Sequence, residues 1–176
     1  MAQTTKPRPR FQKPFEYAGQ ICAAVNAGSL KNGGYSASAM YRFPPLEHFR
    51  HPQLGEALLI RGGNIDARPV GSGFGSHLMR KIYPVFSQIA IRTGRPLIHE
   101  PSANNAGSKR FFVEHHDYSP VERGNLVSRH FLPDGAPRLL PKHQEMLVEL
   151  FLGEERYQVT LPKKRVPERF RKTGRF

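Results

Sequence analysis

The spacing of apolar residues along the chain predicts a mixture of helices and strands. Apolar side chains at steps of three and four residues predict an amphipathic helix over 15–28 that ends at Gly28. Alternation of apolar and polar residues over 35–41 predicts a half-buried strand, and residues 56–63 predict a second strand that ends at two glycines. Residues 64–70 then lead, as a third strand, into a glycine-rich loop.

The second half of the chain continues this alternation of element types. Residues 78–89 carry a helical apolar stripe that Pro84 is expected to kink or break, because proline lacks a backbone N–H. A short strand over 95–101, a helix over 105–116 and a late strand over 126–132 follow. Beyond a turn-rich linker, 142–153 predicts a helix and 156–162 an alternating strand. The order strand, glycine loop, helix, strand and helix is that of an α/β unit.

The loop GSGFGSHLMRKI, residues 71–82, begins with a glycine at every second position. Gly71, Gly73 and Gly75 permit positive φ and leave their amide N–H groups uncovered. A helix that begins in such a loop adds unpaired N–H groups and a partial positive charge. The loop is therefore a candidate phosphate-binding site, with an ordinary structural turn as the alternative.

Two motifs in this order resemble the acetyl-CoA-binding half of the GNAT superfamily of N-acetyltransferases. The first is the phosphate-binding Gly-x-Gly, at Gly73 and Gly75. The second is an Asn followed by a small residue and an aromatic pair, here Asn105, Ser108, Phe111 and Phe112. The resemblance is strong over 71–118 and looser over 15–132. It implies an α/β fold with a GNAT-like mixed, centrally splayed sheet flanked by helices, to which the pattern above adds a C-terminal helix–strand extension and basic arms.

The resemblance implies acetyl-CoA, or another acyl-CoA, as the cofactor, with its pantetheine arm between two splayed strands and its pyrophosphate on the glycine loop. The cofactor-binding residues implied are Val70, Gly71, Ser72, Gly73, Phe74, Gly75, Ser76, Asn105, Phe111 and Phe112. Two positions depart from the family pattern. Val70 stands where a cationic or amide residue is usual, a contact that Arg68 or Arg80 could replace, and Phe112 stands where a tyrosine often protonates the leaving thiolate.

Direct attack of an amine on a thioester needs a general base and a proton donor for the departing thiolate. Glu100 and His99, at the end of the short strand, and Asp66, on the strand before the loop, are the candidate bases. Tyr118 and Ser108 are the candidate proton donors, with a bound water as the alternative. Each of these residues also has an ordinary structural interpretation.

The histidines do not predict a metal site. His115 and His116 are adjacent, so their side chains diverge by about 100° on a helix, and His48 and His51 lie in a proline-rich loop. Asn105 likewise has a second interpretation, because asparagine is a good helix N-cap without any cofactor.

Positive charge is concentrated at both ends of the chain. The formal net charge is +13, of which residues 1–14 carry +4 and residues 162–176 carry +6. Basic arms suit a polyanion, because each neutralised phosphate releases counterions, although they can also serve solubility. We expect nucleic acid or a nucleic-acid-bound protein as the partner. The residues expected to contact it are Lys6, Arg8, Arg10, Lys13, Lys163, Lys164, Arg165, Arg169, Arg171, Lys172 and Arg175.

These features predict four regions: a basic N-terminal arm (1–14), a GNAT-like acyl-CoA-binding domain (15–132), a linker with a helix–strand extension (133–161) and a basic C-terminal tail (162–176). Cys22 is the only cysteine, which excludes an intrachain disulfide and favours a reducing compartment. No apolar run approaches the roughly 20 residues of a membrane span. We therefore expect a cytoplasmic protein without a membrane partner.

Two functions remain open at this stage. The first is an acyl-CoA-dependent N-acyltransferase, most simply an acetyltransferase, acting on an amine in or near a nucleic acid or another anionic macromolecule. The second is a non-catalytic protein of the same fold that binds nucleic acid or a ribonucleoprotein through its basic arms. Phe112 and Val70 favour the second, and the three glycines with Asn105 favour the first.

Overall fold

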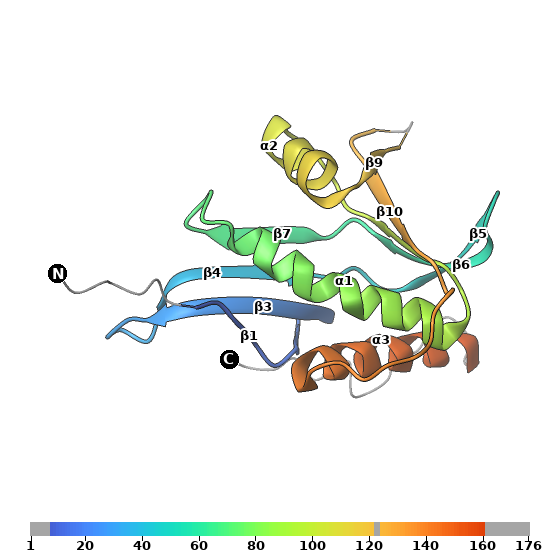
Figure 1. Cartoon of the computed structure of the whole chain (residues 1–176), viewed down its shortest axis with the longest axis horizontal. Coiled ribbons are helices and arrows are strands. Elements are labelled where there is room, and N and C mark those ends of the chain that lie inside the picture. The colour runs from blue at the N-terminus through green and yellow to red at the C-terminus, as the bar shows by residue number, and fades with distance from the viewer. Residues whose placement is uncertain (1–7, 122–123, 161–176) are drawn as a thin grey trace.

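The computed structural model describes residues 8–121 and 124–160, and its strands form two sheets (Figure 1). The first sheet has the order β1 (Arg10–Phe11), β3 (Gln20–Ser29), β4 (Tyr35–Arg42) and β7 (Asn64–Arg68), and β2 (Phe15–Tyr17) also pairs with β3. The second has the order β5 (Glu47–His51), β6 (Gly55–Arg61), β8 (Leu97–Glu100), β10 (Val127–Phe131) and β9 (Ser119–Pro120).

Two long helices lie on one face of these sheets. α1 (Phe74–Thr93) crosses both sheets, and α3 (Lys142–Thr160) lies alongside it (Figure 1). A short helix, α2 (Ala106–Lys109), continues into a π-helical turn, η1 (Arg110–Glu114). Among the described residues, no helix combines the length and hydropathy that a membrane span requires.

The two sheets separate in the middle of one extended segment. β6 pairs in parallel with β8 as far as Arg61 opposite Glu100. After Gly62 and Gly63, whose φ angles are +85° and +106°, the chain continues as β7 and pairs with β4 instead. The predicted α/β fold with a centrally splayed mixed sheet is therefore confirmed.

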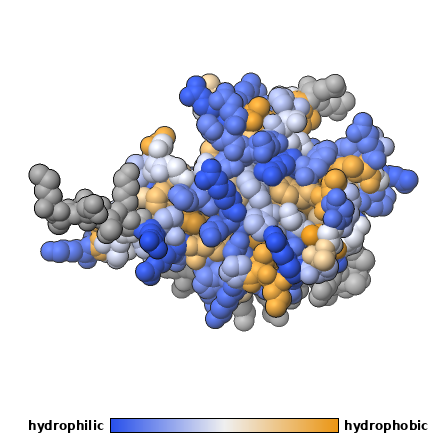
Figure 2. All heavy atoms as spheres, in the orientation of Figure 1, coloured by the Kyte–Doolittle hydropathy of each residue, from blue (hydrophilic) through white to orange (hydrophobic). Residues whose placement is uncertain are grey.

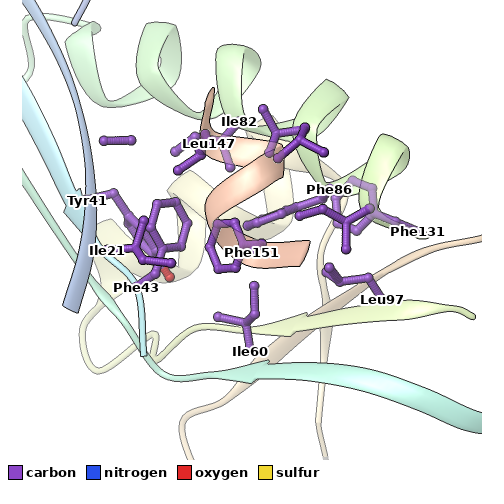
Figure 3. Close-up of a cluster of buried hydrophobic side chains, with 14 of the residues drawn as sticks. Ile21, Tyr41, Phe43, Ile60, Ile82, Phe86, Leu97, Phe131, Leu147 and Phe151 are labelled. Carbon is purple, nitrogen blue, oxygen red and sulfur yellow. The ribbon is translucent and has the colours of Figure 1, made fainter. Parts of the chain in front are cut away.

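The main core lies between the sheets and the two long helices. Buried side chains of β3, β4, β6 and β8 meet Leu78, Ile82 and Phe86 of α1 in one cluster. Phe151 of α3 inserts between Phe43 and Phe86, with ring centroids 5.2 and 6.2 Å away (Figure 3). Aromatic rings in edge-to-face contact contribute about 0.5–1.5 kcal/mol per pair beyond their buried area. α3 is thus part of the core that supports α1.

The prediction of a helix over 15–28 is wrong, because these residues form β2 and β3. Residues 21–25 are all buried, so β3 shows no alternation of apolar and polar positions that would mark it as a strand. Ala18 and Gly19 both have positive φ, as a two-residue hairpin turn between β2 and β3 requires. Pairing on both sides of β3 outweighs the helical spacing of its apolar residues.

Three further differences concern other segments. Pro84 does not end α1, because buried residues on both sides of it hold the helix against the core. The expected strand over 156–162 is wrong as far as the described residues reach, since α3 runs on to Thr160. α3 packs against α1 and not at a sheet edge, so its backbone N–H and C=O groups form hydrogen bonds within the helix. The proline-rich loop around His48 and His51 contains β5, paired with β6.

An ion pair fastens α3 to α1. Arg92, near the end of α1, donates hydrogen bonds to both carboxylate oxygens of Glu145, and its Nη2 also donates to the Arg138 carbonyl at 2.8 Å. The two side chains are 17% and 23% exposed. Glu145 accepts in addition from the Leu140 N–H at 3.2 Å. The Arg92 hydrogen bond lowers the pKa of the Glu145 carboxyl below its ordinary value.

We predict that Glu145→Gln lowers the free energy of unfolding at pH 7 by about 1–3 kcal/mol, the usual cost of losing a hydrogen-bonded charge partner. Because the folded-state pKa of Glu145 is depressed, its contribution is present above the unfolded value of about 4.3 and is lost as pH falls through the folded value. The difference between wild type and variant in urea denaturation should therefore shrink at acid pH. A difference that stays constant down to pH about 3 would contradict this.

Candidate functional site

The glycine loop ends β7 and begins α1 in an open conformation. Gly71 and Gly73 have φ of +78° and +81°, and a Cβ on either would meet no atom within 4 Å. Gly73 is the N-cap of α1 and has no side chain to cap the helix, and the Phe74 N–H lies 3.5 Å from Ser72 Oγ. The open space beside Gly71 and Gly73, together with the helix dipole, suits an anion-binding turn.

Gly75 lies where η1 and β7 meet the start of α1. A Cβ there would lie 3.4 Å from the Phe111 ring and 3.7 Å from Ala67, which are ordinary van der Waals contacts, so packing does not require a glycine at this position. Ser76 Oγ lies 2.9 Å from His116 Nε2, which joins α1 to the end of the helical segment that contains η1. Of the predicted loop residues, Gly75 therefore lies beside Phe111, whereas Val70 is 94% exposed at the loop's edge.

Asn105 and Ser108 form a capping box at the start of α2. Asn105 Oδ1 accepts from the Ser108 N–H at 2.8 Å, and Ser108 Oγ accepts from the Asn105 N–H at 3.1 Å. The Ser108 hydroxyl proton is directed to the Asn105 carbonyl, 3.0 Å away. These contacts account for both residues without a cofactor.

The two candidate carboxylates flank the point where the strands separate. At this point the Gly62 N–H, just after β6, donates a hydrogen bond of 2.6 Å to the Glu100 carbonyl at the end of β8. The Glu100 side chain, 14% exposed, pairs with Arg61 at 3.3 Å. Asp66 lies farther along β7, half exposed, and pairs with Arg68 at 3.4 Å.

The outer face of the first sheet carries a pocket of about 440 Å³. Asp66 and Arg68 of β7 line it, with Lys13 and Phe15 from the N-terminal segment. Ile65 and Ala67, which alternate with them, pack instead toward the main core. Asp66 therefore faces the side of the sheet opposite α1.

A buried Tyr–His–Tyr network crosses the base of the splay. Tyr41 Oη donates to the Gly62 carbonyl at 3.0 Å and lies 2.6 Å from His99 Nε2. His99 Nδ1 lies 2.5 Å from Tyr118 Oη. Because Tyr41 donates its single proton to Gly62, Nε2–H of a neutral imidazole donates to Tyr41, and Nδ1 accepts from Tyr118. His99, a candidate base, is thus fully enclosed, and both its ring nitrogens are engaged.

Burial sets the protonation of this network. It lowers the pKa of His99 to about 3, so the imidazole is neutral at physiological pH. It also raises the pKa of Tyr41 and of Tyr118 above the ordinary range. His116, buried beside Arg80 and Arg129, has its pKa lowered to about 4 mainly by burial.

Phe112 and Tyr118 pack together in a second, smaller cluster, with ring centroids 5.0 Å apart. Phe112 is 4% exposed and Tyr118 is 2% exposed. The Tyr118 hydroxyl is therefore adjacent to the position where the family pattern places a tyrosine, but it points to His99.

The remaining predicted residues lie elsewhere. Arg8, Arg10 and Lys13 precede β2, and Arg10 pairs with Asn26 in the first sheet. The other predicted nucleic-acid contacts, Lys6 and those at 163–175, fall outside the described residues. Within the described part of the chain, no group of three His, Cys, Asp or Glu side chains is placed to hold a metal ion.

No family model and no curated protein matches this chain. Among solved structures, the crystal structure of the KacTA–DNA complex is similar at 14% identity and a TM-score of 0.42, over 76% of this chain and 74% of that chain. The crystal structure of a tyrosine-to-phenylalanine mutant of KacT is similar at 15% identity and a TM-score of 0.43, over 64% and 71%. A likeness this weak carries no argument about function, and the fold of this chain rests on its own strand order.

Tyr41 is the residue of this site that sequence reasoning missed. In the sequence it is one apolar position of an alternating strand, and its contacts with Gly62 and His99 span 21 and 58 residues. The glycine pair after β6 was a signal, since a Cβ on Gly63 would lie 2.0 Å from Tyr41 Oη. Only the tertiary structure shows what approaches that backbone.

We predict that Gly63→Ala destabilises the protein by about 1–3 kcal/mol more than Gly62→Ala, which is the typical cost of overpacking. Both glycines have positive φ, but a Cβ on Gly62 meets only Pro44, at 3.8 Å. The pair therefore separates the steric clash with Tyr41 from backbone strain. Equal losses in urea denaturation would show that Tyr41 does not constrain the splay.

We also predict that the free energy of unfolding falls as pH drops from about 6.5 toward 4. His99 and His116 have folded-state pKa values below the unfolded value, so their contribution is present above about 6.5 and is lost below it. Each histidine contributes a slope of about 1.4 kcal/mol per pH unit. His99→Gln should remove its share of that slope in urea denaturation at several pH values. An unchanged slope would mean that His99 is not buried neutral.

Proposed function

We propose that this protein is an acyl-CoA-dependent N-acyltransferase, most simply an acetyltransferase, whose acceptor amine belongs to or lies near a nucleic acid or another anionic macromolecule. The observation that carries the proposal is the path of one strand. After pairing with β8 as β6, the chain turns away at Gly62 and Gly63 and continues as β7, which leads into an open glycine turn at the start of α1. A strand edge next to an anion-binding turn suits a ligand with an amide-bearing arm and a pyrophosphate.

The chain's own groups fit such a ligand. In the proposal, the open turn at Gly71 and Gly73 holds the pyrophosphate through backbone N–H groups. β7 pairs with β4 on one side only, and its other edge borders the gap toward β8. That edge offers backbone N–H and C=O groups to an extended arm. Acyl-CoA supplies the activated acyl group when it is bound.

We propose that Glu100 or Asp66 accepts the proton from the amine. Glu100 lies at the apex of the splay, and Asp66 faces the pocket on the outer side of β7. Each forms an ion pair with an arginine, Glu100 with Arg61 and Asp66 with Arg68. We assign the donor role to Tyr118, which packs on Phe112, with Ser108 as the alternative.

The basic arms complete the proposal. Lys and Arg side chains at 1–14 and 162–176 would attract the anionic carrier of the acceptor amine. The second candidate function, a non-catalytic nucleic-acid-binding protein of the same fold, is favoured by one observation. Phe112 offers no hydroxyl where the family pattern places its proton donor, and the nearby Tyr118 hydroxyl is bonded to His99.

We predict that Gly73→Glu weakens acetyl-CoA binding at least tenfold in calorimetric titration of the full chain stripped of nucleic acid. The carboxylate would stand in the open space where the proposal puts the pyrophosphate. Gly33→Glu is the matched control, because Gly33 has φ +79° and open space around it in the hairpin between β3 and β4. Both variants carry the same charge change and the same backbone strain.

Micromolar binding by the wild type and the control, with loss only in Gly73→Glu, would support the cofactor site. Equal loss in both variants would trace the effect to strain or charge instead. No binding of acetyl-CoA or CoA by the wild type would overturn the enzyme proposal and leave the binding protein as the better candidate.

A further inference from the structure

A second open groove, of about 600 Å³, runs along the outer side of α1, away from the glycine loop. One wall is α1, the other is β10, and the loop after β10 closes one end. The residues that matter here are Arg80, Tyr83, Arg129, Phe131, Asp134 and Arg138. On the side of the molecule that shows α1, strongly hydrophilic side chains lie between small hydrophobic patches (Figure 2).

The arginines of this groove form no ion pair with a carboxylate in the described part of the chain. Several other arginines do, among them Arg50, Arg61, Arg68, Arg92 and Arg110. Arg80, Arg129 and Arg138 form no ion pair with any described residue, and Asp134 is the one described carboxylate that lines the groove with them. Three guanidinium groups and a single carboxylate give the lining of the groove a net positive charge, which attracts an anionic ligand.

Contacts hold the Arg129 side chain in place. Its guanidinium lies 4.4 Å above the Tyr83 ring and 5.2 Å from that of Phe131, and it donates to the His116 carbonyl at 2.9 Å. Such preorganisation reduces the entropy lost on binding. At Arg138 the backbone is fixed, because its N–H donates to Gln88 Oε1 and its carbonyl accepts from Arg92, each at 2.8 Å, while its side chain is exposed.

The positive charges of the groove affect a neighbouring histidine. Arg80 and Arg129 add to burial in lowering the pKa of His116.

The groove is also long: its α1 wall runs from Arg80 to Ile91, about 16 Å at 1.5 Å per residue. A single phosphate or carboxylate would occupy only a part of that length, whereas a chain of phosphates could meet arginines at both ends.

We propose that this arginine groove binds the phosphodiester backbone of a single-stranded nucleic acid. Planar guanidinium groups match phosphate oxygens, and their spacing along the groove suits a polymer rather than a mononucleotide. The inference deepens the nucleic-acid part of the proposed function, because it assigns nucleic-acid contacts to the folded part of the chain in place of the terminal arms. It does not depend on acyl-CoA binding at the glycine loop.

The test uses the full chain and a fluorescein-labelled single-stranded RNA of about 15 nucleotides, with affinity measured by anisotropy from about 50 to about 300 mM salt. Arg80→Gln/Arg138→Gln removes two exposed cations and leaves the packed Arg129 in place. Arg50→Gln/Arg110→Gln is the matched control: these exposed arginines lie outside the groove, and the net charge changes equally. We expect the groove variant to reduce the salt slope by about 1.4, or 0.7 per lost phosphate contact, and the control to change it far less.

Any of four outcomes would overturn the proposal. The slope could be unchanged in the groove variant, or both double variants could lower it equally, which would indicate net charge alone. Polyglutamate of matched charge could also displace the RNA as well as unlabelled RNA does, which would indicate a groove for acidic chains in general. Acetyl-CoA titration of the same variants keeps the proposals apart: loss of acetyl-CoA binding with RNA binding intact would assign the groove to the cofactor and overturn the inference.

Discussion

The contact of Tyr41 with Gly62 and Gly63 is the constraint on which the rest of the structure depends. The Tyr41 ring lies so close to Gly63 that no side chain fits there, and its hydroxyl bonds the Gly62 carbonyl. Two consecutive residues with positive φ turn the strand away from β8 and toward β4 at this point. The gap between the sheets, and the direction in which β7 delivers the glycine loop, both follow from that turn.

The elements around the gap are coupled through the helices. α1 begins at the glycine loop, is joined to the segment after η1 by the Ser76–His116 hydrogen bond, and packs through Phe86 on both Phe43 and Phe131. α3 then secures α1 from outside through Phe151 and the Arg92–Glu145 ion pair. The second half of α1, from Phe86 to Arg92, is therefore held by α3 as well as by the sheets.

The chemistry that the site can support is divided between backbone and side chains. The features that favour a cofactor are backbone features: an open turn, the start of a long helix and a strand edge that no other described strand covers. The candidate catalytic side chains already have structural partners: Glu100 and Asp66 pair with arginines, and Tyr118 bonds to His99. They are therefore weaker indications of catalysis than the backbone features are of a cofactor. The three unpaired arginines beside α1 are the side-chain feature that most directly indicates a ligand, and that ligand is anionic.

The sequence by itself determined the local features of this protein. Glycine periodicity located the turn before α1, apolar periodicity located α1 and β10, and Asn105 with Ser108 marked the start of α2. These features depend on residues close together in the chain. The order of strand, glycine loop, helix and strand was enough to predict a mixed α/β fold.

The tertiary structure decided what depends on distant contacts. Residues 15–28 have helical spacing but become strands, because β3 pairs along one edge with β4 and along the other with β1 and β2. His99 reads as an exposed base candidate at a strand end, yet Tyr41 and Tyr118 enclose it from 58 and 19 residues away. Likewise, the sequence around Arg80, Arg129 and Arg138 does not show that the three residues line one groove. Their positions depend on hydrogen bonds and packing between residues far apart in the chain, which the pattern of neighbouring residues does not encode.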